Sequence, residues 1–147
     1  MKKKIFLMLL IIGSLTFSAD TKKEIYNLIT DIEAAPENPK NSEKLQKIVR
    51  FTIEDEDTTV YLIGNILGNK EKDRVDDKSQ NAIIMSYTMG ALKEQLISEK
   101  KLTQDETTLK GIFAALKTYN RLKKTNDIYI EYFELLNEFD FSKLLSD

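Results

Sequence analysis

The sequence contains no cysteine, no histidine and no tryptophan among its 147 residues. Without cysteine the chain can form no disulfide and can carry no lipid on an N-terminal cysteine, which excludes a lipoprotein. Without histidine and cysteine, neither a Ser-His-Asp or Cys-His relay nor a typical zinc or haem site can be built. Catalysis would have to use carboxylates, lysine, tyrosine or hydroxyl groups, and we assign no catalytic residue, no metal ligand and no cofactor.

Residues 1–19 have the three parts of a secretory signal peptide. Three lysines precede an apolar run from Ile5 to Ile12, and small residues follow at Thr16, Ser18 and Ala19. A membrane anchor is the competing interpretation, but the stretch from Ile5 to Ala19 is shorter than the roughly 20 apolar residues that span a bilayer core. We therefore predict cleavage after Ser18 or Ala19, and a mature chain in the periplasm or secreted.

The mature chain would keep about 128 residues, numbers 20–147, which is the usual length of a single domain. The whole sequence has 22 basic and 24 acidic residues, and removal of the three signal-peptide lysines leaves 19 against 24, a net charge of −5. An acidic balance argues against a dedicated nucleic-acid binder, so we expect no nucleic-acid partner. The lysine-led signal and the many Lys, Asn and Ile residues indicate a bacterial chain.

Apolar residues recur at helical spacing along most of the mature chain. This pattern predicts an all-α single domain of five to seven helices, arranged as a bundle or an irregular array. Pro36 and Pro39 break the chain after the first helix, and Thr103 with Glu106 has the spacing of a capping box. The predicted helices cover about residues 21–35, 41–54, 58–68, 79–100, 103–124, 127–139 and 141–145.

The same spacing predicts which side chains are buried. The helices over 58–68 and 79–100 are apolar on nearly every side and are expected to be innermost. Ile128, Ile130 and Tyr132 alternate as in a strand, but the longer 3.6-residue pattern favours a helix that starts at Asn126 or Asp127. Its expected buried residues are Ile128, Tyr132, Leu135, Leu136 and Phe139; those of the helix over 41–54 are Leu45, Ile48, Val49 and Thr52 or Ile53.

Four consecutive acids, Glu54 to Asp57, are the residue type that hard cations prefer. An EF-hand loop begun at Asp55 would need glycine at its sixth position and glutamate at its twelfth, where Val60 and Ile66 stand. This excludes an EF-hand. A looser cation site is the alternative, and we prefer the interpretation of a solvated junction between two helices.

Four glycines fall inside predicted helices, where each costs about 1 kcal/mol relative to alanine. They are Gly64, Gly68, Gly90 and Gly111. We expect close helix crossings at these positions, with the floor of a pocket as the functional alternative. Among the aromatic residues near the C-terminus, Tyr129 and Phe141 lie at the margin of the apolar stripe and are expected to be exposed.

Charged residues form two stripes on neighbouring predicted helices. The basic stripe is Lys110, Lys117, Arg121 and Lys124, and the acidic stripe is Asp127, Glu131, Glu134 and Glu138. One interpretation is that they are the solvated faces of two antiparallel helices, whose exposed pairs contribute only about 0 to 1 kcal/mol each. The other is that one stripe binds a partner of opposite charge, where complementarity mainly raises the association rate.

These observations favour a non-catalytic binding protein of the cell envelope, of the inhibitor, immunity or adaptor type. Its partner would be another envelope or secreted protein, and the mature chain would not be embedded in a membrane. The alternative is a carboxylate-based hydrolase of peptidoglycan or another envelope glycan, which needs two carboxylates across a cleft with one held protonated. A carrier of a small ligand, with a closed apolar cavity, is a third hypothesis.

Overall fold

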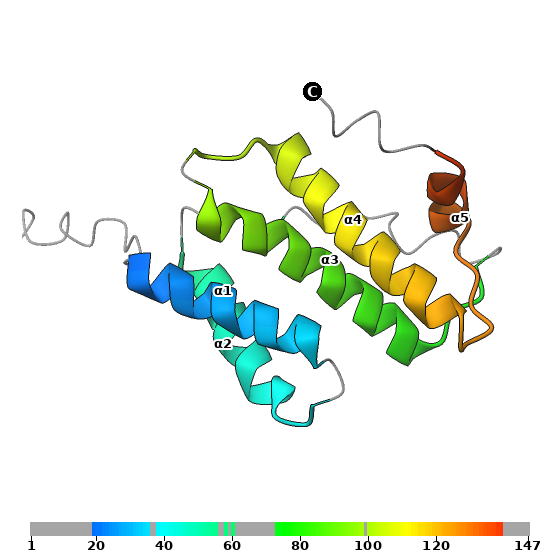
Figure 1. Ribbon diagram of the computed structural model, residues 1–147, viewed down its shortest axis with the longest axis horizontal. Helices are drawn as coiled ribbons and strands as arrows, with labels where there is room; N and C mark the ends of the chain where they lie inside the picture. Colours follow the sequence, from blue (N-terminus) through cyan, green and yellow to red (C-terminus); the bar gives the residue numbers. More distant parts are fainter. Residues whose placement is uncertain are drawn as a thin grey trace, which may run out of the picture. The chain divides into compact units, whose positions relative to one another are not determined.

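The computed structural model describes residues 19–35, 38–55, 58, 60, 73–98 and 100–139. Within these residues the chain forms five helices and no strand (Figure 1): α1 (Ala19–Ala34), α2 (Asn41–Glu54), α3 (Asp77–Ile97), α4 (Gln104–Lys123) and α5 (Glu131–Glu138). This confirms the all-α prediction. The predicted signal peptide apart from Ala19, nearly all of the predicted helix over 58–68 and the predicted helix over 141–145 lie outside the described residues.

The chain divides into two compact units, so each is described by itself. Unit 1 comprises residues 1–59 and 96–99 and holds α1 and α2, while unit 2 comprises residues 60–95 and 100–147 and holds α4, α5 and nearly all of α3. That residues 20–147 fold as one domain stays a prediction. Of the helices described, none combines the length and the apolar character that a membrane crossing requires.

Unit 1 is an antiparallel pair of helices. Ile25, Ile29 and Ile32 of α1 are buried, and so are Ile48 and Phe51 of α2, because each set recurs at three- or four-residue spacing and lines one face of its helix. These faces pack against each other. The predicted break between the helices is present, since α1 ends at Ala34 and α2 begins at Asn41.

The buried stripe predicted for α2 is partly wrong, because two of its residues are exposed. Val49 and Ile53 were expected in the core, but their exposed fractions are 54% and 79%. The residues that face α1 are Ile48 and Phe51, three positions apart, and Val49 is turned about 100° from Ile48 around the helix. Since α1 covers only one face of α2, the stripe that contains Val49 and Ile53 is left outside.

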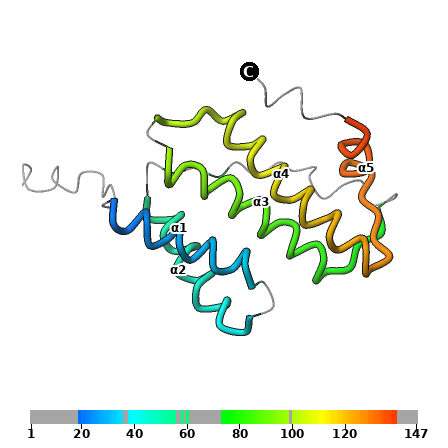
Figure 2. The backbone as a smooth tube through the Cα atoms, in the orientation of Figure 1, coloured from blue at the N-terminus to red at the C-terminus, as the bar shows by residue number. Residues whose placement is uncertain are grey.

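Unit 2 is built around α3 and α4, which run side by side in Figure 2, with α5 near the end of α4. Its core is one cluster of buried side chains contributed by both long helices and by the segment around α5. The buried members are Ile83, Tyr87, Ala115, Leu116, Tyr119, Ile128, Ile130 and Phe133. In the helix predicted over 79–100, Ile83, Tyr87 and Leu92 are each exposed by 1% or less.

Two glycines allow α3 and α4 to approach closely. A Cβ atom placed on Gly90 would lie 2.4 Å from Cβ of Ala114 and 3.0 Å from the carbonyl oxygen of Lys110. A Cβ atom on Gly111 would lie 2.6 Å from the ring of Tyr87. The predicted close crossing is therefore confirmed at both positions, while Gly64 and Gly68 lie outside the described residues.

The capping box predicted at the start of α4 is also confirmed. The backbone N–H of Glu106 donates to the hydroxyl of Thr103 over 3.2 Å, and the backbone N–H of Thr103 donates to the Glu106 carboxylate over 2.8 Å. This bond from Thr103, together with the ammonium of Lys100, lowers the pKa of Glu106 to about 2. An ionised Glu106 therefore stabilises the first turn of α4.

Replacement of Thr103 by alanine is expected to lower the free energy of unfolding by about 1 kcal/mol, because an N–H in the first turn of α4 loses its acceptor. Gln104→Ala, at the neighbouring exposed position, is the control and should change it by less than about 0.5 kcal/mol. The contribution of Glu106 should be complete above pH 4.5 and disappear as the pH falls toward about 2, since its folded pKa is lowered. Chemical denaturation at both ends of this range measures these effects, and equal losses in both variants would contradict the capping role.

The start of α5 differs from the prediction. Residues 128–130 are extended rather than helical, and Tyr129 exchanges both backbone hydrogen bonds with Arg74, over 2.7 and 2.8 Å. Because side chains alternate along an extended segment, Ile128 and Ile130 both point into the core, as the strand-like pattern of the sequence indicates. The helix begins only at Glu131.

This later start changes which residues of α5 are buried. Phe133 is fully buried, whereas Leu135 and Phe139, both expected in the core, have exposed fractions of 52% and 69%. Tyr132 and Leu136 are partly buried and pack against the core cluster. Tyr129, expected to be exposed, is half-buried, and Phe141 lies outside the described residues.

Candidate functional site

The basic stripe lies on α4 and its C-cap, and its four members have different surroundings. The ammonium of Lys110 lies 3.8 Å from the carboxylate of Glu94 on α3. Lys117, Arg121 and Lys124 are exposed, and in the described part of the chain no acid forms an ion pair with them. We call these three residues the basic surface. At positions i, i+4 and i+7 they fall within roughly 60° of one another around the helix.

Only three of the four acids in the predicted acidic stripe lie on one helix, which corrects the prediction for Asp127. Asp127 precedes α5, in the segment that leads to the bridge with Arg74, and its carboxylate lies 3.6 Å from the Arg74 guanidinium. Glu131, Glu134 and Glu138 are on α5, but Glu134 turns toward α4. Glu138 is exposed. Asp127 is not part of this helix face because α5 starts four residues after it.

Glu134 belongs to a polar cluster that joins α5 to α4. The hydroxyl of Tyr119, a fully buried residue, donates to the Glu134 carboxylate and accepts the backbone N–H of Ile130 over 3.3 Å. The ammonium of Lys123 donates to the same carboxylate oxygen. For Glu134 the geometry therefore supports the first interpretation of the charged stripes, in which charges on two neighbouring helices attract each other.

The pKa values in this cluster follow from burial and hydrogen bonding. Burial, and then the hydrogen bond to Glu134, raise the pKa of the Tyr119 hydroxyl above its usual range. Burial opposes the charge of Glu134, but the hydrogen bonds from Lys123 and Tyr119 outweigh it and lower the pKa of this carboxyl group. The cluster is thus a charged acceptor held between two donors.

A second pair of contacts fixes α5 against α4 without charge. The side-chain amides of Asn120 and Asn137 donate to each other, over 2.8 and 2.9 Å. Asn120 directly precedes Arg121, so the helix that carries the basic surface is held in place by α5 as well as by its capping box. The basic surface is therefore carried by a helix that contacts both α3 and α5.

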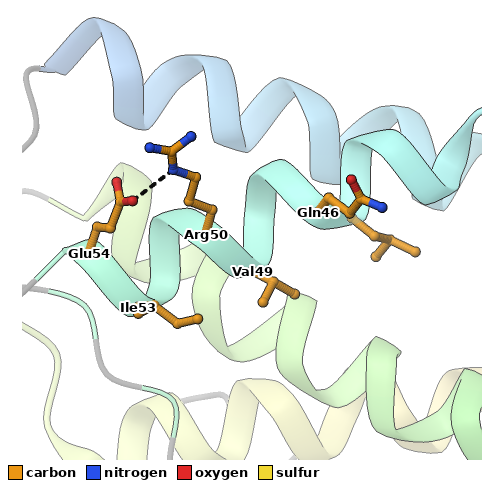
Figure 3. A pocket seen from close by; sticks show the side chains of 6 residues that line it. Gln46, Val49, Arg50, Ile53 and Glu54 are labelled. Atoms are coloured by element: carbon orange, nitrogen blue, oxygen red, sulfur yellow. Dashed lines mark hydrogen bonds and ion pairs between the residues drawn. The ribbon is translucent and has the colours of Figure 1, made fainter.

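An open hollow of about 430 Å³ lies along α2 (Figure 3). It is lined by the exposed outer face of this helix, namely Leu45, Gln46, Val49, Arg50, Ile53 and Glu54. Arg50 donates to Glu54 over 2.7 Å beside the apolar side chains of Val49 and Ile53. Sequence reasoning missed this surface, and the signal for it was Phe51, which with Ile48 defines a buried face that leaves out Val49 and Ile53.

The acidic run at the end of α2 is only partly solvated, which corrects its interpretation. Asp55 is 3% exposed, and the only cation near its carboxylate in the described part of the chain is the ammonium of Lys22, at 4.0 Å. Asp55 is buried because the antiparallel pairing brings the first turn of α1 to the last turn of α2. Glu56 and Asp57 lie outside the described residues. Among those described, no group of three acids could hold a metal ion.

Among the described residues, the pKa is lowered from its ordinary value at the carboxyl groups of Asp76, Glu106 and Glu134. Asp76 accepts from the hydroxyl and the backbone N–H of Ser79. A glycan hydrolase needs one acid with a raised pKa. None of these three carboxyl groups supplies such an acid.

Comparison with protein-family models, with curated proteins and with solved structures gives no match. The argument for function therefore depends on the residues of this chain. Two exposed features stand out in the described part, the basic surface on α4 and the apolar outer face of α2. Of these, the basic surface carries a charge that specifies the chemistry of its partner.

Proposed function

We propose that this chain is a non-catalytic binding protein of the inhibitor, immunity or adaptor type, which acts in the cell envelope or outside the cell. It docks on another protein through the basic surface. The observation that carries the proposal is a contrast on α4 and its C-cap. Lys110 and Lys123 are paired with acids of the same unit, whereas Lys117, Arg121 and Lys124 are exposed and pair with no acid among the described residues.

Two physical arguments support docking at this surface. Unpaired charges of one sign on a protein surface attract a partner of opposite charge and raise the association rate. A surface carried by a rigid helix loses little conformational freedom on binding, and the contacts of α4 with α3 and α5 supply that rigidity. Arg121 can also fix the orientation of the partner, because a guanidinium can bind a carboxylate through two parallel hydrogen bonds.

The predicted signal peptide supports the part of the proposal that concerns export. We expect the precursor to be trimmed at a bond between about residues 17 and 20, with the mature chain recovered outside the cytoplasm. Mass spectrometry of the intact protein from that fraction measures the cleavage. A chain that keeps Met1 to Phe17 there would be an anchored protein and would overturn the proposed localisation.

Affinity capture with charge variants tests the docking surface. We expect the mature chain to retain a protein from an envelope extract of the native cells, and the double variant Lys117→Glu/Arg121→Glu to lose it. The matched control is Lys40→Glu/Lys101→Glu, which changes the net charge equally at exposed lysines just before two helix N-termini, where an acid is tolerated.

The control variant should retain the same protein, and melting temperatures of both variants should stay near that of the parent, since surface substitutions change stability little. Equal retention by the parent and by Lys117→Glu/Arg121→Glu would show that the basic surface is merely solvated. Equal loss in both variants would show that net charge, and not this surface, controls binding.

A further inference from the structure

We infer that the partner of the basic surface is an acidic helix of another protein, whose carboxylates recur at i, i+4 and i+7. This inference rests on the proposed docking function and adds the chemistry of the partner. Lys117, Arg121 and Lys124 have the same spacing on α4, so at 1.5 Å per residue they span about 10 Å of helix length. A row of carboxylates on a second helix of the same pitch matches that span.

The charge of the rest of the molecule favours a narrow partner over an extended polyanion. The mature chain has a net charge of −5, so the residues other than the three cations of the basic surface carry a net charge of −8. Attraction by three cations is screened beyond about 8 Å at physiological salt. Nucleic acid and an anionic bilayer extend well past this distance and would meet the repulsive remainder, whereas one acidic helix meets the cations alone.

The burial of α4 also argues against a membrane surface. A helix that binds a bilayer needs a free apolar face to insert below the headgroups. On α4 that face is occupied, because Ala115, Leu116 and Tyr119 are buried in the core of unit 2. The charged face of α4 is therefore the one that a partner can contact.

The composition of the surface predicts the kind of contact. The large exposed apolar side chains of the described residues lie on α2, α3 and α5 or at the end of α5, and none lies on α4. A contact made mainly of exposed ion pairs is small, wet and sensitive to salt. The acidic helix would thus bind transiently, with specificity set by the spacing of its carboxylates.

A synthetic peptide tests the assignment directly. The probe is a fluorescent alanine-based helical peptide with glutamates at i, i+4 and i+7, and its matched control has glutamines there. We expect the mature chain at low salt to bind the glutamate peptide about tenfold or more tightly than the glutamine peptide, measured by fluorescence anisotropy. Lys117→Glu/Arg121→Glu should remove this preference, and Lys40→Glu/Lys101→Glu should keep it.

Two further binding measurements test the other polyanions as partners. Phosphatidylglycerol vesicles and duplex DNA should bind more weakly than the glutamate peptide at equal charge concentration. If either binds more tightly and depends on Lys117 and Arg121, the acidic-helix assignment is wrong. If the peptide fails to bind while protein capture still depends on these residues, the assignment is wrong but the docking surface stands. If capture is independent of them as well, both proposals fail.

Discussion

Replacement of Phe133 by alanine is expected to lower the free energy of unfolding of unit 2 by about 3 to 5 kcal/mol. Phe133 is fully buried, its ring stacks on Tyr119 with centroids 5.2 Å apart, and the edge contact with Tyr132 is at 5.5 Å. Its removal leaves a cavity between α4 and α5, in the part of the core that holds α5 in place. The loss is a large fraction of the roughly 5 to 15 kcal/mol that stabilises a domain.

Denaturant unfolding followed by near-ultraviolet circular dichroism of the tyrosines measures this effect, because the sequence has no tryptophan and most of its tyrosines lie in unit 2. Leu135→Ala is the matched control on the same helix. Since Leu135 is about half exposed, its truncation should cost much less than that of Phe133. A cost for Leu135 equal to that for Phe133 would show that α5 is rotated from the orientation described.

Gly90→Ala is expected to destabilise unit 2 by about 1 to 3 kcal/mol, although alanine favours a helix over glycine by about 1 kcal/mol. The new methyl group would lie 2.4 Å from Cβ of Ala114 and 3.0 Å from the backbone oxygen of Lys110, so α3 and α4 would have to separate. Neither neighbour is the end of a flexible side chain, and the clash cannot be relieved by a rotamer change.

A methyl swap separates this clash from helix propensity. The double variant Gly90→Ala/Ala114→Gly keeps one methyl group at the crossing and exchanges one glycine for another, so its unfolding free energy should return most of the way to that of the parent. Double-mutant analysis of the unfolding curves gives the coupling between the two positions. If Gly90→Ala alone is neutral or stabilising, the helices do not approach as closely as described.

The long helices were predictable because their signals are local. The capping box at Thr103, the prolines after the first helix and the apolar residues of α3 each depend on neighbours within four or five positions along the chain. The glycine crossing was also predictable, since Gly90 and Gly111 are costly in helices without a tertiary reason. These features follow from backbone hydrogen bonding and side-chain spacing within a single segment.

The predictions that were wrong depend on contacts between segments that are far apart in the sequence. The segment around Tyr129 is extended because it pairs with Arg74, which lies 55 positions earlier, and no local pattern contains that information. Val49 and Ile53 of α2 were assigned to the core because an apolar residue was assumed to be covered, whereas α1 covers only the face of Ile48 and Phe51. A stripe of apolar residues predicts a helix more reliably than it predicts which face is buried.

The candidate site was predictable only in part, because its spacing is local but its pairing depends on the fold. The spacing of Lys117, Arg121 and Lys124 on one helix face is a property of the sequence. Which charges remain free is not, because it depends on acids brought near by the fold. Glu134 binds Lys123, and Glu94 lies beside Lys110. These tertiary contacts pair Lys110 of the basic stripe and Glu134 of the acidic stripe, whereas Lys117, Arg121 and Lys124 stay exposed.

The association rate with the captured partner, measured at increasing salt concentration, tests the central claim most directly. For the mature chain the rate should be high at low salt and fall steeply as salt screens the basic surface. For Lys117→Glu/Arg121→Glu it should be lower throughout and nearly flat, while Lys40→Glu/Lys101→Glu should follow the parent. Rates and salt slopes that are the same for the parent and for Lys117→Glu/Arg121→Glu would contradict docking through the basic surface.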